Sequence, residues 1–243
     1  MSAASSPALI NRFVAELVAT AMLLAAIVGS GIMGERLAAG NVAIALLANS
    51  IATGGALLAI ILAFGGISGA HLNPVVTLSD ATLGRLAWRE VPIYVVAQFL
   101  GAFAGVSVAH LMFGLPIFLA SQHLRNGGSQ LLSESVATFG LLAVILGCVR
   151  QRPAALPGAV ASYITAAYWF TASTSFANPA VTVARAATNT FSGIRPADVP
   201  GFVLAQILGA AIATALFRWL FPALPDRADS VLVRPRLEKK YGK

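Results

Sequence analysis

The stretch Ser68-Gly69-Ala70-His71-Leu72-Asn73-Pro74-Val75-Val76-Thr77 decides how this 243-residue chain folds. Its Asn-Pro pair recurs at Asn178-Pro179, and each pair is followed by X-Val-Thr. Asparagine is a preferred N-cap and proline is favoured at the first helical position, so each pair predicts the start of a helix. The apolar stretches 73–84 and 178–189 amount to about 18 Å of helix each. That length crosses only half of a bilayer's hydrocarbon core, which is ~30 Å thick.

The composition places these half-length helices in a membrane protein. Hydrophobic residues make up 58% of the chain and charged residues only 10%, whereas soluble domains carry roughly 25% charged residues. A water-soluble globular protein and a disordered chain are both excluded, because disordered chains are poor in apolar residues. Long apolar segments predict membrane-spanning helices at 9–33, 42–66, 91–114, 131–149, 157–174 and 199–221. The predicted fold is therefore an all-α membrane protein of six transmembrane helices and two re-entrant half helices, with the lipid bilayer as its partner.

The two halves of the chain repeat each other. Ala-Glu-Leu-Val-Ala-Thr at 15–20 recurs as Ser-Glu-Ser-Val-Ala-Thr at 133–138, and Ala-Gln-Phe-Leu-Gly-Ala at 97–102 recurs as Ala-Gln-Ile-Leu-Gly-Ala at 205–210. Three crossings per half is an odd number, so the second copy enters the membrane inverted. Inverted repeats place a permeation site near the midplane, at broken helices. We expect one channel domain over 1–221, with repeats at about 9–114 and 131–221 and a basic tail at 222–243.

Basic residues set the predicted orientation. If the N-terminus is inside, twelve Lys and Arg residues lie on the cytoplasmic side and four on the outer side. The positive-inside rule then predicts cytoplasmic N- and C-termini. Topology explains the net charge of +7 better than nucleic-acid binding does. No nucleophile is paired with a base at a recognisable spacing, and no His, Cys, Asp or Glu cluster has metal-ligand spacing. We therefore expect no enzyme activity, no metal and no cofactor.

The inverted halves bring Asn73 and Asn178 together at the predicted pore centre. Both half helices would meet there N-terminus to N-terminus, each with about +0.5 charge from its macrodipole. This meeting point disfavours cations without holding an ionised side chain, and the two asparagine amides can aim N–H donors into the lumen. The irregular backbone before each asparagine persists at membrane depth only where it lines a watery cavity. The carbonyl groups expected to line the pore are those of Gly69, Ala70, His71, Thr174, Ser175 and Phe176.

These motifs resemble the aquaporin, or major intrinsic protein, family over about residues 9–221. The resemblance rests on the 68–77 stretch, on Asn178-Pro179-Ala180, and on the pairs Glu16/Glu134 and Gln98/Gln206. It implies passive conduction of water or small neutral solutes, a homotetramer with one pore per subunit, and a bacterial plasma membrane. A charged carboxylate at membrane depth is costly and usually functional. We expect Glu16, Glu134, Gln98 and Gln206 to hold the loops that lead into the half helices, in preference to forming a proton relay.

The selectivity filter is where the chain departs from the family pattern. Counted from the two asparagines, the four filter positions fall on Thr53, Ala166, Ser175 and Val181, and none of these is charged. Water-selective relatives would show Phe, His, a small residue and Arg, and glycerol-type relatives would show Trp, Gly, Phe and Arg. Arg185 lies one turn beyond Val181 on the same helix face. It either reaches back to the constriction or extends to the outer interface.

An uncharged filter predicts a wide, arginine-free constriction that passes solutes larger than water. Glycerol, urea and neutral metalloid or methylated arsenical hydroxides are the expected permeants, as in relatives resembling bacterial arsenic-resistance channels. A water-selective aquaporin is the alternative. An ion-coupled secondary transporter is a further alternative, because inverted repeats also occur in that class.

Overall fold

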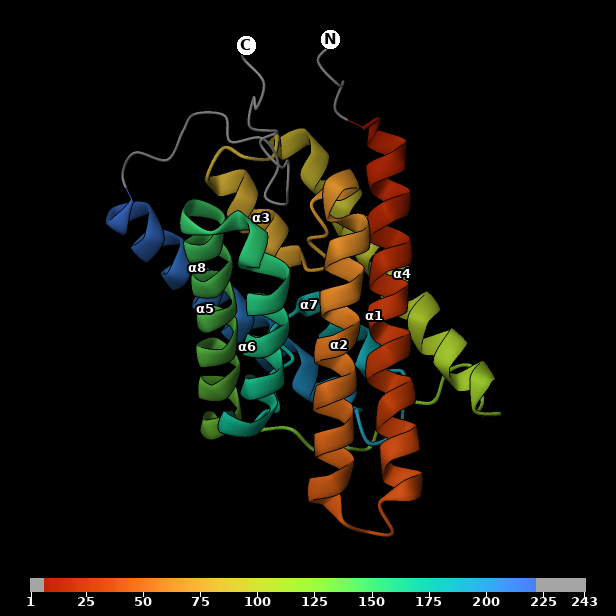
Figure 1. Ribbon diagram of the computed structural model, residues 1–243. Coiled ribbons are helices and arrows are strands. Elements are labelled where there is room, and N and C mark those ends of the chain that lie inside the picture. Colours follow the sequence, from red (N-terminus) through yellow and green to blue (C-terminus); the bar gives the residue numbers. More distant parts are fainter. Residues whose placement is uncertain (1–6, 222–243) are drawn as a thin grey trace, which may run out of the picture.

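The computed structural model describes residues 7–221, so the predicted basic tail at 222–243 lies outside the described residues. The described part is all-helical, as predicted, and its elements follow the expected order (Figure 1). The α-helices are α1 (Leu9–Leu37), α2 (Val42–Ser68), α3 (Pro74–Thr82), α4 (Val91–Met112), α5 (Gly128–Gln151), α6 (Leu156–Phe170), α7 (Pro179–Arg185) and α8 (Val199–Leu220). Short 3₁₀ turns at Trp88–Glu90, Pro153–Ala155 and Pro196–Asp198 precede α4, α6 and α8.

Five helices of the described part are long and apolar enough to cross a membrane. These are α1, α2, and the helices that include α4, α5 and α8. Helix α6 has only 15 residues and ends at Phe170, short of the predicted 174. Helix α7 likewise ends at Arg185 rather than near 189. Both end early because the chain around α7 must turn sharply, first to reach Asn178 and then to leave the pore region.

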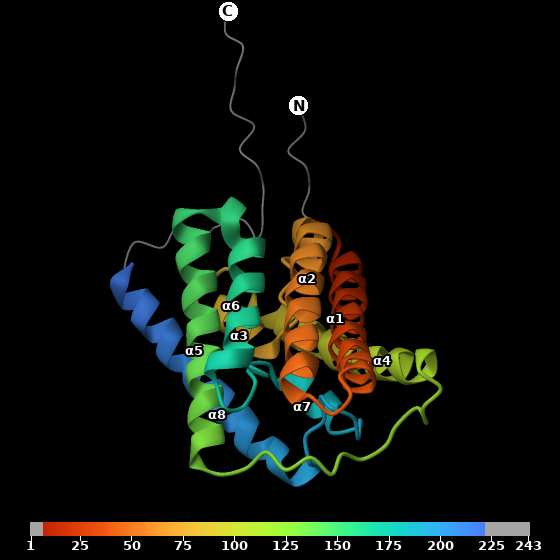
Figure 2. The ribbon, with the colours of Figure 1, turned by 60° about the horizontal axis from the view of Figure 1, so that its bottom comes forward.

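The two repeats pack as related bundles. Helix α1 lies against α4 and α2, and α5 lies in the same way against α8 and α6. The two repeats contact each other through α2 and α6. Each half helix also contacts the last long helix of the other repeat: α3 packs against α8, and α7 packs against α4. Figure 2 shows α3 and α7 enclosed by the long helices. This arrangement holds both half helices in the interior, where their N-termini can meet.

Corresponding glycines permit the closest helix contacts. A Cβ atom on Gly101 of α4 would collide with the backbone oxygen of Leu17 in α1, and one on Gly209 of α8 would collide with that of Ser135 in α5. Small residues at such crossings let membrane helices approach closely. The two glycines occupy matching places in the repeated Ala-Gln-X-Leu-Gly-Ala segments, so the same close crossing is built twice.

Replacing Gly209 by alanine is expected to lower the free energy of unfolding by about 1–3 kcal/mol, the usual cost of overpacking. The measurement is the thermal midpoint of the purified protein in detergent. Gly55→Ala is the matched control, because a Cβ atom there has nothing within 4 Å. Alanine favours a helix over glycine by roughly 1 kcal/mol, so the control should be unchanged or slightly more stable. Equal midpoints for the two variants would contradict the close crossing.

Candidate pore

The two half helices begin at asparagines that cap them and also reach across to each other's loop. Asn73 Oδ1 accepts from the backbone N–H of Val75, and Asn178 Oδ1 accepts from the N–H groups of Ala180 and Val181. Asn73 Nδ2 donates to the carbonyl oxygen of Ala177 at 2.7 Å, and Asn178 Nδ2 donates to that of Leu72 at 2.7 Å. Each Nδ2 carries two N–H groups, so the prediction that the amides aim donors into the lumen now concerns the second N–H of each. One N–H of each amide binds the opposite loop, and this exchange fixes the two N-termini against each other.

The loops before the asparagines share one strained conformation. Residues four, three and one positions before each asparagine have positive φ angles, namely Gly69, Ala70 and Leu72 in the first loop and Thr174, Ser175 and Ala177 in the second. Five of these six are not glycine, and a left-handed conformation costs such residues roughly 1–2 kcal/mol each. Such a conformation persists only where surrounding contacts impose it, so each loop needs an anchor.

Buried carboxylates supply those anchors. Glu16 in α1 accepts from the backbone N–H groups of His71 and Leu72 at 2.9 and 2.8 Å, and also from Ser68 Oγ and Gln98 Nε2. Its side chain is fully buried. These contacts use both carboxylate oxygens as acceptors for the loop.

The second repeat copies this network. Glu134 in α5 accepts from the N–H groups of Phe176 and Ala177, both at 2.9 Å, and from Gln206 Nε2. The glutamines also donate to the threonines of the X-Val-Thr motifs, Gln98 to Thr77 and Gln206 to Thr182. The contacts of the two glutamates and the two glutamines are therefore those of loop support.

One narrow cavity of about 80 Å³ runs past both asparagines. It holds several water molecules, since one water needs roughly 10–15 Å³ of such a volume. Its walls are mostly apolar side chains, among them Leu23, Leu57, Leu141, Val160 and Ile164. Polar atoms enter the lining chiefly from the two loops and from the ends of the cavity.

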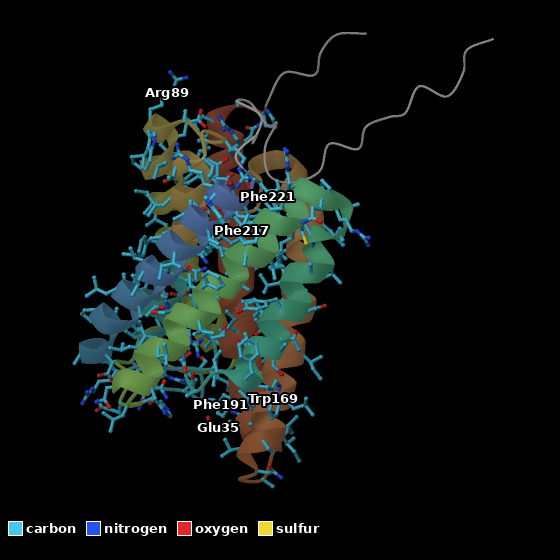
Figure 3. The ribbon with its side chains drawn as sticks, turned by 90° about the vertical axis from the view of Figure 1, so that its left-hand side faces the viewer. Glu35, Arg89, Trp169, Phe191, Phe217 and Phe221 are labelled. Atoms are coloured by element: carbon cyan, nitrogen blue, oxygen red, sulfur yellow. The ribbon has the colours of Figure 1, made fainter. Side chains whose placement is uncertain are left out.

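Five of the six residues whose carbonyls were expected in the pore line this cavity: Gly69, Ala70, His71, Ser175 and Phe176. Thr174 instead lines a second cavity of about 350 Å³ on the α7 side. Glu35 and Phe191 also line this second cavity, and Figure 3 shows both at the end of the molecule opposite Arg89 and Phe221. Among residues 7–221, no donor binds the six carbonyl oxygens. They are therefore available to a molecule in transit.

Three of the four expected filter residues line the main cavity: Thr53, Ser175 and Val181. The fourth expectation is wrong, because Ala166 is exposed on the surface of α6. The positions of α6 that line the cavity are 156, 160, 164 and 168, spaced about one turn apart. We call the end of the cavity that Arg185 lines the α7 end. Tyr168 is the α6 residue at this end, and its Oη lies 3.2 Å from Thr53 Oγ1. A tyrosine side chain occupies more of this end than an alanine would.

The expectation of a filter without arginine is also corrected. Arg185 is only 2% exposed and lines both the main cavity and the second one. Its guanidinium carbon lies 3.4 Å from the centroid of the Phe176 ring, and its Nε donates to the carbonyl oxygen of Ser192. Of the two alternatives for Arg185, the side chain adopts the one directed at the cavity rather than at the outer interface.

Arg125 is a residue that the sequence analysis missed. It lies in the connection between the repeats, and its guanidinium carbon is 4.9 Å from the same Phe176 ring. Its Nε donates to the carbonyl oxygen of Gly193 at 2.8 Å, and its backbone N–H donates to Asp198. Asp198 also accepts from Arg195 Nη2 at 2.7 Å. These contacts of Asp198 anchor the segment that carries Arg125.

The α3 side of the cavity carries a second polar group. His71 lines the cavity, and its ring Nε2 lies 3.2 Å from Asp80 Oδ2. Asp80 in turn pairs with Arg85 at 3.0 Å. Neither Asp80 nor Arg85 was singled out from the sequence; Asp80 lies on α3, and Arg85 follows the end of that helix. Within residues 7–221, no three His, Cys, Asp or Glu side chains gather as a metal site requires.

Comparisons with known proteins agree with this architecture. Residues 3–172 match the family model described as Major intrinsic protein. The chain is 56% identical over 218 residues to aquaglyceroporin AqpS of Rhizobium meliloti (strain 1021), which covers 89% of this chain and 93% of that protein. It is 37% identical over 147 residues to aquaporin NIP1-1 of Zea mays, or 60% of this chain and 51% of that one.

A solved structure shares the fold. The X-ray structure of the aquaglyceroporin from Plasmodium falciparum superposes with a TM-score of 0.67 at 18% identity. The match covers 89% of this chain and 97% of that one.

Proposed function

This chain belongs to the major intrinsic protein family, and we propose that it is a passive membrane channel for water and small uncharged solutes such as glycerol. Members of this family are channels rather than enzymes. The observation that carries the proposal is the reciprocal pair of hydrogen bonds from Asn73 and Asn178, made beside one cavity that both repeats line. The similarity to aquaglyceroporin AqpS supports a solute larger than water.

The chemistry of the cavity suits neutral, hydroxylated molecules. The N-termini of α3 and α7 each place about +0.5 charge at the asparagines, which repels cations. The unpaired carbonyl oxygens of the two loops accept hydrogen bonds from the hydroxyl groups of a solute, and the apolar walls contact its carbon atoms. Neutral metalloid hydroxides present the same hydroxyl groups as polyols, so we include them among the proposed permeants.

One observation favours the alternative of a water-selective channel. Tyr168, Phe176 and Arg185 all line the main cavity, and Arg185 stacks on Phe176, so large side chains stand where a filter of small residues was expected. An ion-coupled transporter has less support. The titratable pair His71 and Asp80 lies on the α3 side, and Asp80 is already paired with Arg85.

We also propose the assembly and orientation that the family resemblance implies. The chain is a multi-pass membrane protein, consistent with its five long apolar helices. Four subunits would assemble with one pore each. Both termini would face the cytoplasm of a bacterial cell, which places the α7 side outward by the positive-inside rule.

Solute flux into proteoliposomes tests the proposed function. Stopped-flow light scattering should show faster water, glycerol, urea and arsenite permeation than in protein-free liposomes, with rates linear in solute concentration. Collapsing an imposed proton or sodium gradient should change none of these rates. Accelerated water flux without any larger solute would select the water-specific alternative, and gradient-dependent flux would select a coupled transporter.

A further inference from the structure

The filter position three residues after Asn178 holds Val181, which carries no charge. The positive N-termini of the half helices lie deeper in the pore. If position 181 were the only place for a cationic side chain, the α7 end of the cavity would therefore carry no positive charge. Arg185, one helical turn further along α7, supplies a guanidinium at this end. Its Nε is bound to the backbone of Ser192, and its two terminal nitrogens make no hydrogen bond within residues 7–221. These two nitrogens can therefore donate hydrogen bonds to a molecule in the cavity.

Arg125 brings a second guanidinium to the same ring from a segment distant in sequence. The segment 119–123 is bound to the chain after α7: the N–H groups of Leu119 and Ser121 donate to the carbonyl oxygens of Ala187 and Ala186. The guanidinium of Arg125 is then held by the carbonyl oxygens of Gly193 and Ser173 at 2.8 and 3.1 Å. A side chain with this many fixed contacts is positioned, not merely solvated.

Phe176 joins the two cations to the pore. Its ring contacts both guanidinium groups, its residue lines the main cavity, and its backbone N–H donates to Glu134. Stacking on an aromatic face stabilises a guanidinium without neutralising it. Two buried carboxylates belong to this region, Glu134 and Asp198, and Asp198 is paired with Arg195. The two guanidinium groups therefore face the single remaining charge of Glu134, and a net positive potential remains.

We infer that Arg125 and Arg185, held on Phe176, form a two-residue cationic filter that takes the place of a charged residue at position 181. This inference rests on the proposed channel function. The pair excludes inorganic cations and protonated amines at the α7 end, and the terminal nitrogens of Arg185 donate hydrogen bonds to the oxygens of neutral solutes. The uncharged residues of the same constriction are Thr53, Tyr168, Ser175 and Val181.

Charge-deleting variants test the pair. Proteoliposomes containing Arg185→Met or Arg125→Met should show a potassium or methylammonium leak at least about tenfold above wild type, because a unit charge a few ångströms from the path dominates the barrier to a cation. Glycerol flux should match wild type in Arg125→Met. In Arg185→Met, which removes donors to the solute, it should be lower but still above that of protein-free liposomes. A voltage-sensitive dye reports the potassium leak, and light scattering on the same vesicles reports glycerol. Arg185→Lys keeps the charge and should keep the vesicles tight to cations.

Arg36→Met is the matched control, because Arg36 also stacks on a phenylalanine, Phe113, but lines neither the main cavity nor the second one, whereas Arg185 lines both and Arg125 lines the second. It should leak no more than wild type. An exchange variant separates charge from folding: Val181→Arg combined with Arg185→Val moves the guanidinium one turn back and should restore cation exclusion.

Each failure has a distinct signature. If the wild type passes no neutral solute, the proposed function fails. Glycerol flux in Arg185→Met and Arg125→Met shows that these variants are folded. If wild type and both variants pass glycerol, but the variants leak no more cations than Arg36→Met, the two-arginine filter is overturned. If Arg185→Met loses its glycerol flux, the exchange variant decides instead. A cation leak in the exchange variant as large as that of Arg185→Met would likewise overturn the inference.

Discussion

Replacing Glu16 by alanine is expected to abolish solute flux and to give a protein that unfolds at a much lower temperature. The carboxylate accepts four hydrogen bonds at a site with no solvent exposure. Alanine leaves four buried donors without an acceptor, and each unsatisfied group costs about 1–3 kcal/mol. The loss reaches several kcal/mol even when some donors find new partners. For a chain of this size, that corresponds to a fall of roughly 10 °C or more in the thermal midpoint.

The expected loss of flux has a specific structural origin. Leu72 and Ala70 have positive φ angles that their side chains disfavour, and the N–H of Leu72 is bound by Glu16. Once that bond is gone, the loop can relax to an ordinary conformation. The carbonyl oxygen of Leu72 then leaves Asn178 Nδ2, and the contact between the two half helices is lost.

Glu35→Ala is the control for the Glu16 variant, because both residues lie on α1 and Glu35 is exposed. Its midpoint and flux should match those of wild type. Glu16→Gln should fall between the two, since the amide keeps an acceptor oxygen but loses the charge that strengthens each bond. A Glu16→Ala protein with the midpoint of Glu35→Ala would refute the anchoring role.

The features of this site that could be predicted from the sequence are those that both repeats carry. Glu16 and Glu134 occupy matching positions in similar segments, and so do Asn73 and Asn178. A residue type that recurs at the same position of an inverted copy is expected to have the same role in both repeats. The cap chemistry of an Asn-Pro pair is local, so the half-helix starts followed from a few residues. The all-helical fold could be predicted from hydropathy, because long apolar segments are also a local property of the sequence.

The features that could not be predicted depend on side-chain direction and on loop paths. Counting back from Asn178 gave Ala166, but the count crosses the end of α6 at Phe170, and helical periodicity instead directs Tyr168 to the cavity. Residue spacing alone did not settle the direction of Arg185. Arg125 had no pattern to reveal it, because its place depends on backbone carbonyl groups of residues 173 and 193.

Replacing Asn73 by aspartate is expected to open the channel to cations. The substitution keeps the shape of the side chain and the Oδ1 cap on Val75, but it removes the Nδ2 donor to the carbonyl oxygen of Ala177. A carboxylate oxygen then faces that carbonyl oxygen, which separates the two N-termini. An ionised aspartate also puts a full negative charge where the two helix dipoles together supply about one positive charge. The electrostatic barrier at the centre of the pore is thereby removed.

The measurement is the potassium leak of proteoliposomes, followed between about pH 6 and pH 9 because a desolvated carboxyl can ionise late. We expect a leak that grows with pH and exceeds that of wild type by at least about tenfold. Asn41→Asp is the matched control: Asn41 caps α2 through Ala43 and Ile44 and is exposed. Aspartate and asparagine are equally good caps, so this variant should fold and stay tight to potassium at every pH. If Asn73→Asp is as tight as Asn41→Asp across that range while still conducting water, the positive meeting point of the half helices is not what excludes cations.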